Sequence, residues 1–337
     1  MSNRYPSRSF SRLVLCGFAI LAVTPLAHAS ESSDIDLGAT VFVHWGYDMK
    51  PTPYEGYVDG DPRPNAVDID RAFFHVGSQL DDTFSVRLQT DVARDESGKM
   101  GVLIRNAYLQ VDLVDDVKLQ FGSADNPMNL LSTTFWDHRW LSKSLGDEND
   151  SVQSADLGVY FVGEHADGLL GWSAAVVNGE GYDELDTDYD KALQVRFTVD
   201  PLHGDMKLPI SIYASQDVYT HDDIEGHTVL MASLGFDHEF ANIWGEYILD
   251  HAGDAKAGGM SFSVVGKIKD LFNVVGRYDT WDPNKDDKGD EKNTLIAGVT
   301  RHFNDHVSLG LTFEHITYKA DPKQPHKGIF FRVQAGF

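Results

Sequence analysis

The amino-acid sequence predicts an all-β fold: one antiparallel β-barrel of 16 strands that crosses a membrane. Three observations predict it. Apolar and polar residues alternate along segment after segment, so each strand has one apolar and one polar face. The connectors between these segments are alternately short and long, as at the two rims of a barrel. After residue 29 the chain has no stretch of 18 apolar residues, so no transmembrane helix is expected.

Residues 1–29 predict a cleaved signal peptide, and the barrel is expected over 30–337. The segment has a basic head with three arginines, a mostly apolar stretch of 14 residues over 13–26, and a small-x-small cleavage site at Ala27-His28-Ala29. Such a chain is exported to the periplasm, the exterior or the outer membrane of a Gram-negative cell.

Composition excludes several functions. The chain has 28 Lys+Arg and 52 Asp+Glu, and three of the basic residues lie in the signal segment, which leaves a net charge of −27 on 308 residues. This charge argues against nucleic acid as a partner, because nucleic-acid binding needs basic surface. The only cysteine, Cys16, also lies in the signal segment, so neither a disulfide nor a Cys-ligated zinc site is predicted for the rest. No cofactor and no other metal site are predicted either.

The alternating segments number 16, and bacterial barrels have an even number of strands. They cover residues 34–48, 67–79, 82–94, 102–113, 117–124, 157–165, 168–178, 190–200, 207–217, 227–238, 241–251, 257–269, 271–281, 292–303, 306–319 and 327–337. Backbone amides inside a bilayer must all be paired, so the sheet has to close on itself. A large soluble all-β protein is the alternative, but its connectors would not alternate in length.

The last segment supports an outer-membrane location. Ile329, Phe331, Val333 and Phe337 share one face of it. Ending on a phenylalanine after alternating apolar residues resembles the terminal signal of barrels that the outer-membrane insertion machinery handles. The expected partners are therefore outer-membrane lipid and lipopolysaccharide.

Several short motifs between residues 67 and 147 carry a resemblance to a known family. They are Ile69–Phe74 (IDRAFF), Val86–Asp91 (VRLQTD), Ile104–Leu109 (IRNAYL) and Leu119–Gly122 (LQFG), followed by Asn126-Pro127. In order and spacing this region resembles the phosphate-selective porin O and P family of Gram-negative outer membranes. The resemblance implies a water-filled diffusion channel, commonly a homotrimer, whose third long loop folds inward and narrows the pore.

That loop would cover residues 125–156, and the residues themselves agree with the inward path. It is the longest connector, at 32 residues, and it is unusually aromatic, with Phe135, Trp136 and Trp140 beside Leu141. Such side chains should pack against something, and the inner barrel wall is available. The alternative is a loop folded over a neighbouring subunit or forming a loop tip.

Candidate pore residues are the charged groups predicted to face the lumen or to lie on the third loop. They are His138, Arg139, Lys143, Arg87, Asp91, Arg196, Lys267, Arg277, Glu314 and Arg332. Anion selection needs rows of Lys or Arg along a pore. Here acidic residues share the inward phase, and three predicted outer loops are strongly acidic, so the sequence departs from a phosphate channel and favours weak cation preference or little selectivity.

The predicted function is passive diffusion of small hydrophilic solutes or ions, and phosphate specificity is doubtful. The alternative is an outer-membrane binding or adhesion barrel with a plugged lumen, which would pass no current. No nucleophile, P-loop or metalloprotease motif occurs in the sequence, so the chain is not predicted to be an enzyme.

Overall fold

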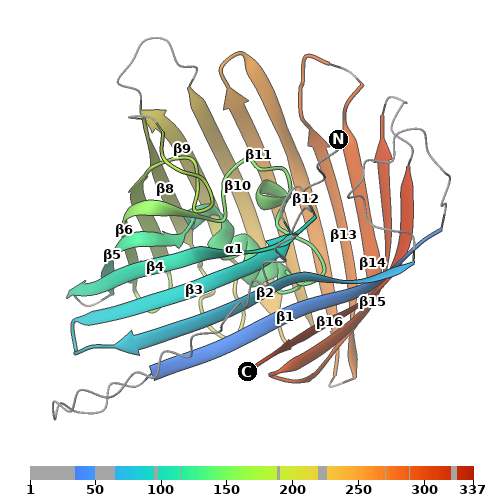
Figure 1. The fold of residues 1–337 in the computed structure, drawn as a ribbon, viewed down its shortest axis with the longest axis horizontal. Helices are drawn as coiled ribbons and strands as arrows, with labels where there is room; N and C mark the ends of the chain where they lie inside the picture. The colour runs from blue at the N-terminus through green and yellow to red at the C-terminus, as the bar shows by residue number, and fades with distance from the viewer. Residues whose placement is uncertain are drawn as a thin grey trace, which may run out of the picture. The chain divides into compact units, whose positions relative to one another are not determined.

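The computed structural model describes residues 35–49, 65–94, 98–114, 116–187, 190–218, 226–269, 271–287, 289–319 and 325–337. Its 16 strands form one closed sheet in which each strand is antiparallel to both neighbours, and β1 pairs with β16 (Figure 1). The predicted 16-stranded barrel is therefore confirmed. The predicted signal peptide and residues 219–225 of one acidic loop lie outside the described residues.

The strands are β1 (Ile35–Asp48), β2 (Ala66–Gln79), β3 (Phe84–Arg94), β4 (Met100–Val114), β5 (Val117–Asp125), β6 (Ala155–His165), β7 (Leu170–Val177), β8 (Lys191–Val199), β9 (Ile210–Val218), β10 (His227–His238), β11 (Ala241–Ala252), β12 (Ala255–Ile268), β13 (Phe272–Asp282), β14 (Lys292–Asn304), β15 (Val307–Tyr318) and β16 (His326–Gly336). The predicted segments match these bounds to within three residues. The agreement follows from the period of two, which a half-buried strand imposes on its sequence.

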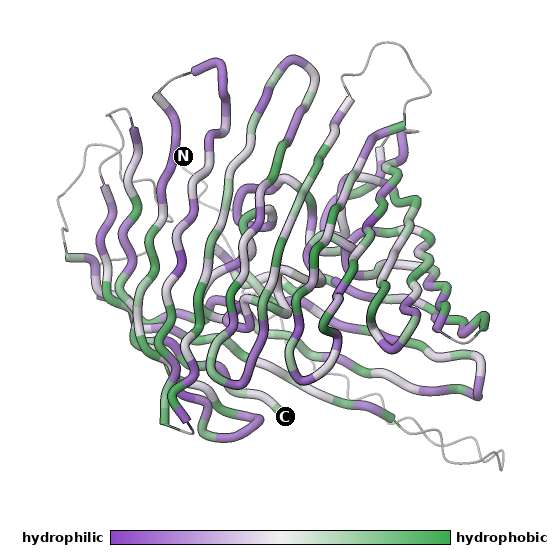
Figure 2. The backbone as a smooth tube through the Cα atoms, turned by 180° about the vertical axis from the view of Figure 1, so that it is seen from behind, coloured by the Kyte–Doolittle hydropathy of each residue, from purple (hydrophilic) through white to green (hydrophobic). Residues whose placement is uncertain are grey.

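Alternation separates the two faces of the sheet, and Figure 2 shows hydrophobic and hydrophilic residues alternating along the strands. In β11, Trp244, Glu246 and Ile248 are buried inside the barrel, whereas Tyr247 between them is 49% exposed on the outside. The inward face therefore mixes polar, charged and aromatic groups, and the outward face is apolar.

Side-chain oxygens close several of the tight turns. The Asp81 carboxylate accepts hydrogen bonds from the backbone N–H groups of Thr83 and Phe84, each at 2.8 Å. Asn304 does the same between β14 and β15, where its Oδ1 accepts from His306 and Val307 at 2.9 and 2.8 Å. Such Asx turns satisfy the backbone donors that a reversing chain exposes.

Two connectors depart from the predicted alternation of short and long. Residues 200–209 between β8 and β9 form a ten-residue connector, because Pro209 has no N–H for the ladder and β9 begins only after it. Between β11 and β12 only Gly253 and Asp254 intervene, where a long loop is expected. Gly253 has a φ of 58°, which a two-residue hairpin requires.

Two helices occur in the described part of the chain, α1 (Pro127–Trp136) and α2 (Leu145–Glu148), and both lie between β5 and β6. Neither is long and apolar enough to cross a membrane. Figure 1 shows α1 enclosed by the ring of strands.

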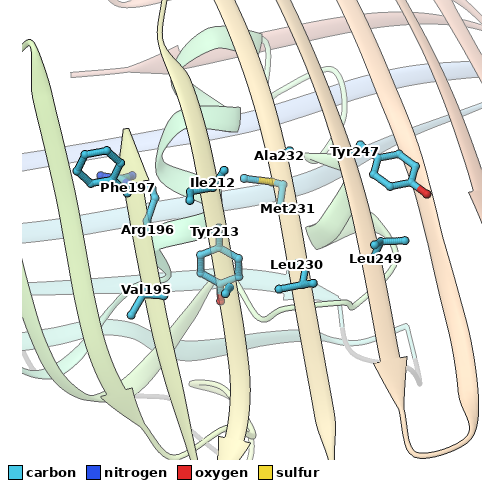
Figure 3. Close-up of a pocket in the computed structure, with 11 residues that line it drawn as sticks. Val195, Arg196, Phe197, Ile212, Tyr213, Leu230, Met231, Ala232, Tyr247 and Leu249 are labelled. Carbon is cyan, nitrogen blue, oxygen red and sulfur yellow. The ribbon is translucent and has the colours of Figure 1, made fainter. Parts of the chain in front are cut away.

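The outer surface carries an apolar groove of about 340 Å³ over β8 to β11 (Figure 3). It is lined by Val195, Phe197, Ile212, Ala214, Leu230, Ala232, Tyr247 and Leu249 among others. The small side chains of Ala214 and Ala232 leave room between larger neighbours. The groove is part of the apolar outer face of the sheet.

Candidate functional site

Loop 3, the connector over residues 126–154, crosses the inside of the barrel. Asn126 caps α1, since its Oδ1 accepts a hydrogen bond from the Met128 N–H at 2.9 Å, and Pro127 occupies the first helical position. Asp137 ends the helix with a φ of 48°. Helix α1 contacts β8, β10, β11 and β12, which lie three to seven strands from β5 in the sheet. The predicted inward path of the third loop is therefore confirmed.

Glu246 on β11 holds the loop to this wall. Its carboxylate accepts hydrogen bonds from the Ser132 hydroxyl at 2.6 Å and from the Leu145 N–H at 3.3 Å. The Trp244 indole N–H also donates to it, at 3.0 Å. One buried carboxylate thus holds the middle of α1 and the first residue of α2.

Arg277 on β13 is a second attachment. Its guanidinium is paired with Asp279, with Nη2 to Oδ2 at 2.8 Å, and it donates to the Lys143 carbonyl at 2.6 Å and to the Ser142 hydroxyl at 3.1 Å. It also lies 5.2 Å from the centre of the Trp136 ring. Most of its donors therefore serve loop 3 or its own carboxylate partner.

Arg196 and His138 complete the attachments. Arg196 on β8 donates to the Pro127 carbonyl at 3.1 Å. His138 is fully buried, with Nδ1 3.0 Å from the Trp136 carbonyl and Nε2 2.9 Å from the Thr300 hydroxyl. Burial lowers the pKa of His138 to about 4, so the ring is neutral at pH 7. Nδ1 then donates to the carbonyl, and Nε2 accepts from Thr300.

We call β8 to β14, which carry these attachments, the anchoring wall. On the other side of the loop tip lies a cavity of about 320 Å³, the constriction cavity, bounded by β1, β2, β15 and β16, the cavity wall. It is lined by Phe42, Asp70, Arg71, Arg139, Trp140, Leu141, Ser142, Lys143, Glu148, Glu314 and Arg332. Four candidates from the sequence, Arg139, Lys143, Glu314 and Arg332, thus meet at one place.

Charged pairs surround this cavity. Arg139 donates to Asp147 at 2.6 Å, and the Lys143 ammonium lies 3.8 Å from the same carboxylate. Arg332 Nη2 lies 2.7 Å from Glu314 Oε1. Burial lowers the pKa of Arg139, and the Asp147 carboxylate opposes that shift.

Arg71 on β2 is a cavity residue that the sequence-based candidates omit. It forms a bidentate pair with Asp91, a buried candidate on β3, through Nε at 2.8 Å and through Nη2. Tyr182 joins this pair from loop 4, the connector over residues 178–190. Its hydroxyl donates to Asp91 at 2.8 Å and accepts from Arg71 at 3.1 Å. Burial raises the pKa of Tyr182 to about 12, so it stays protonated.

Loop 4 is therefore a second loop that turns into the lumen, where the sequence predicts only an acidic outer loop. A glycine allows the close approach. Gly181 has a φ of 97°, and a Cβ at this position would lie 2.5 Å from the Gln153 side chain of loop 3.

A bulge explains why alternation misses Arg71. The pairing of β1 with β2 shifts between Phe42 and Val43, which oppose Arg71 and Ile69, so Asp70 has no partner in the ladder. Asp70 and Arg71, adjacent in sequence, then both line the cavity. A similar shift in β4 skips Arg105, which pairs with Asp125 at 2.8 Å.

Two of the remaining candidates, Arg87 and Lys267, neither line the constriction cavity nor belong to the attachments described above. Arg87 is near the short-turn rim, where it donates to Gln89 at 3.0 Å and lies 4.0 Å from Asp36. Lys267 is next to the turn between β12 and β13, and it donates to Asp237 at 2.7 Å. Among the described residues, no group of three or more His, Cys, Asp or Glu side chains is arranged to hold a metal ion.

A closed barrel of 16 strands with an inward third loop is the fold of outer-membrane porins, and comparison with solved structures agrees. The anion-selective porin of Comamonas acidovorans is similar with a TM-score of 0.65 and 10% identity, over 91% of this chain and 100% of that one. Pseudomonas putida OprB has a TM-score of 0.66 and 7% identity, over 90% and 94% of the two chains. The trimer form of Vibrio cholerae OmpT, an outer membrane protein, has a TM-score of 0.63 and 12% identity, over 91% and 100%.

Identities this low establish likeness of fold alone. No family model and no curated protein matches the sequence.

Proposed function

We propose that this protein is a channel of the Gram-negative outer membrane through which small hydrophilic solutes or ions diffuse passively. The observation that carries the proposal is the position of loop 3, which is attached to the anchoring wall and leaves the constriction cavity against the cavity wall. A lumen narrowed in this way and lined by charged side chains sorts solutes by size and charge. The likeness to porin structures supports the same conclusion.

The proposal includes a cleaved signal peptide over residues 1–29, a single barrel domain over 30–337, and a homotrimer in contact with lipid and lipopolysaccharide. The apolar groove over β8 to β11 and the exposed apolar residues of the outer face support contact with lipid. The trimer form of one similar structure supports the oligomeric state. We propose no catalytic role.

Selectivity is the finer part of the proposal. Arg71, Arg139, Lys143 and Arg332 line the cavity, as an anion channel requires, but carboxylates lie beside them. Phosphate specificity, which the family resemblance implies, requires that phosphate block the current. Little net selectivity is expected from charges that balance at short range.

The test is single-channel current of the purified, folded protein in a planar bilayer under a KCl gradient. Discrete conductance steps are expected, and the reversal potential reports the preference for cations or anions. Heat-denatured protein from the same preparation is the control and should give no steps.

A second function, a binding or adhesion barrel with a plugged lumen, is favoured by one observation. Trp140 and Leu141 of loop 3 belong to one buried apolar cluster with Phe42 on β1 and with Val265 and Val275 on β12 and β13, so apolar side chains bridge the lumen. The absence of current from a correctly folded barrel would support this function and contradict the channel.

A further inference from the structure

The constriction cavity has an apolar surface and a basic surface, which fit an apolar group and a negative charge on the same solute. We infer that it binds monoanionic carboxylates that carry an apolar ring while they pass through the channel. This inference rests on the proposed channel function and names the class of solute for the same site.

The apolar half of the cavity consists of Phe42 from β1 with Trp140 and Leu141 from the tip of loop 3. Phe42 is supported from behind by Phe73, edge to face at 5.8 Å. Gly310 on β15 makes room for the loop tip, because a Cβ there would lie 2.8 Å from the Trp140 ring. A ring that enters the cavity replaces water with contacts to the side of this apolar cluster that lines it.

The basic half lies on the same loop tip. Arg139 and Lys143 share one carboxylate, Asp147, whereas Arg71 and Arg332 each have a carboxylate of their own, Asp91 and Glu314. Two more carboxylates line the cavity, and each has a basic partner outside the loop tip: Glu148 lies 3.7 Å from Lys292 Nζ, and Asp70 lies 2.6 Å from His44 Nδ1. Arg139 and Lys143 are thus two cations that share one carboxylate, an arrangement that can take one further carboxylate.

Arg139 and Lys143 also have donors to offer. In the described part of the structure, Arg139 uses only Nη2 in a hydrogen bond, although a guanidinium has five N–H donors. Lys143 is held more loosely, with its side chain 41% exposed and its ammonium 3.8 Å from Asp147. A carboxylate in the cavity can accept from both without breaking the pair of Arg139 with Asp147.

Size and hydration set limits on the solute. About 320 Å³ is at the lower end of small-molecule sites, which suits a solute with one ring. Phosphate carries strongly hydrated oxygens on every side, and the apolar half offers nothing to replace that water. Acetate has the charge but no apolar body to fill the space.

The test is block of single-channel KCl current by benzoate, measured with the full-length folded protein in planar bilayers. The comparison solutes are acetate, which lacks the ring, benzyl alcohol, which lacks the charge, and inorganic phosphate, which lacks an apolar body. We expect half-maximal block by benzoate at a concentration lower by about tenfold or more than for any of the three.

Three variants locate the effect. Lys143→Gln and Trp140→Leu should each weaken the block by about fivefold to tenfold, the first through charge and the second through the ring. Lys267→Gln, a lysine at the short-turn rim outside the cavity, should leave it unchanged. If Trp140→Leu fails to fold, Lys143→Gln alone decides.

The outcomes separate the two proposals. A conducting channel that benzoate blocks no better than acetate or phosphate overturns this inference and leaves the channel function standing. Equal weakening by Lys267→Gln and Lys143→Gln also overturns it. A folded barrel that passes no KCl current overturns the channel function and this inference together.

Discussion

The two sides of the barrel differ in their contacts with loop 3. The anchoring wall contributes Glu246, which accepts hydrogen bonds from the loop, and Arg277 and Arg196, which donate to loop carbonyls. The cavity wall contributes Arg71 and Arg332, which are paired to carboxylates on neighbouring strands, Asp91 on β3 and Glu314 on β15, and which line the cavity. An inward-facing arginine that donates to loop 3 therefore supports the constriction, whereas one paired with a carboxylate on a neighbouring strand lines it.

The strongest test of this difference replaces the two arginines in matched fashion. Arg277→Met should lower the free energy of unfolding by about 3–5 kcal/mol, because it leaves Asp279 buried without its partner and releases the Lys143 carbonyl. Arg332→Met should lower it by roughly half as much or less, since Glu314 is left beside the cavity and gains access to water.

Urea unfolding of the reconstituted barrel measures both losses. Single-channel recordings should show a larger, noisier conductance only for Arg277→Met. Equal losses in the two variants, with equal conductance, would remove the distinction between the walls.

The sequence predicts which face of the sheet these arginines occupy, but not whether they hold loop 3 or line the cavity. The period of two places Arg277 and Arg332 on the inward face correctly, because a strand between lipid and lumen must alternate. It carries no information on which inward groups loop 3 will cover, since Glu246 and Ser132 are 114 residues apart and meet only through the path of the loop. Arg71 is missed for a local reason, because the bulge at Asp70 breaks the period just where the cavity lies.

Acid should weaken the anchoring wall. The pKa of His138 is about 4 in the folded barrel, below its ordinary value of 6.5, so the unfolded chain takes up the proton first as the pH falls. The contribution to stability is complete above pH 6.5 and is lost progressively down to about pH 4. Between about pH 7 and about pH 4.5 the loss from this one group should be about 2–3 kcal/mol.

Urea unfolding at the two pH values measures the effect, with His138→Gln as the reference for all other titrating groups. The variant should lose less stability on acidification than the original chain. An identical pH dependence in both proteins would rule out His138 as the acid-sensitive attachment.

Charge at the cavity should set ion preference more strongly than charge at the rim. Lys143→Glu changes the local charge by two units, which at roughly 8 Å in water lowers the energy of a cation and raises that of an anion by about 1 kcal/mol each before screening. Screening over about one Debye length reduces each change to about 0.4 kcal/mol, so the ratio of cation to anion permeability should rise about fourfold. Lys267→Glu at the short-turn rim is the matched control and should change the ratio by less than about twofold. Reversal potentials under a KCl gradient measure both, and equal shifts would place the selective region elsewhere.

The smallest expected change in stability comes from a substitution in loop 4, which tests whether that loop helps to hold the cavity wall. Tyr182→Phe removes one hydroxyl that bridges Asp91 and Arg71 but leaves their bidentate pair in place. The free energy of unfolding should fall by only about 1 kcal/mol. The current should fluctuate more, because Arg71 loses one of its two partners next to the cavity.

Tyr278→Phe is the matched control, since that hydroxyl donates to Asn293 on the exposed face of β13 and β14. If Tyr182→Phe lowered the free energy of unfolding as much as Arg277→Met does, loop 4 would hold the constriction as firmly as the anchoring wall. If stability and current were both unchanged, loop 4 would have no part in holding the constriction.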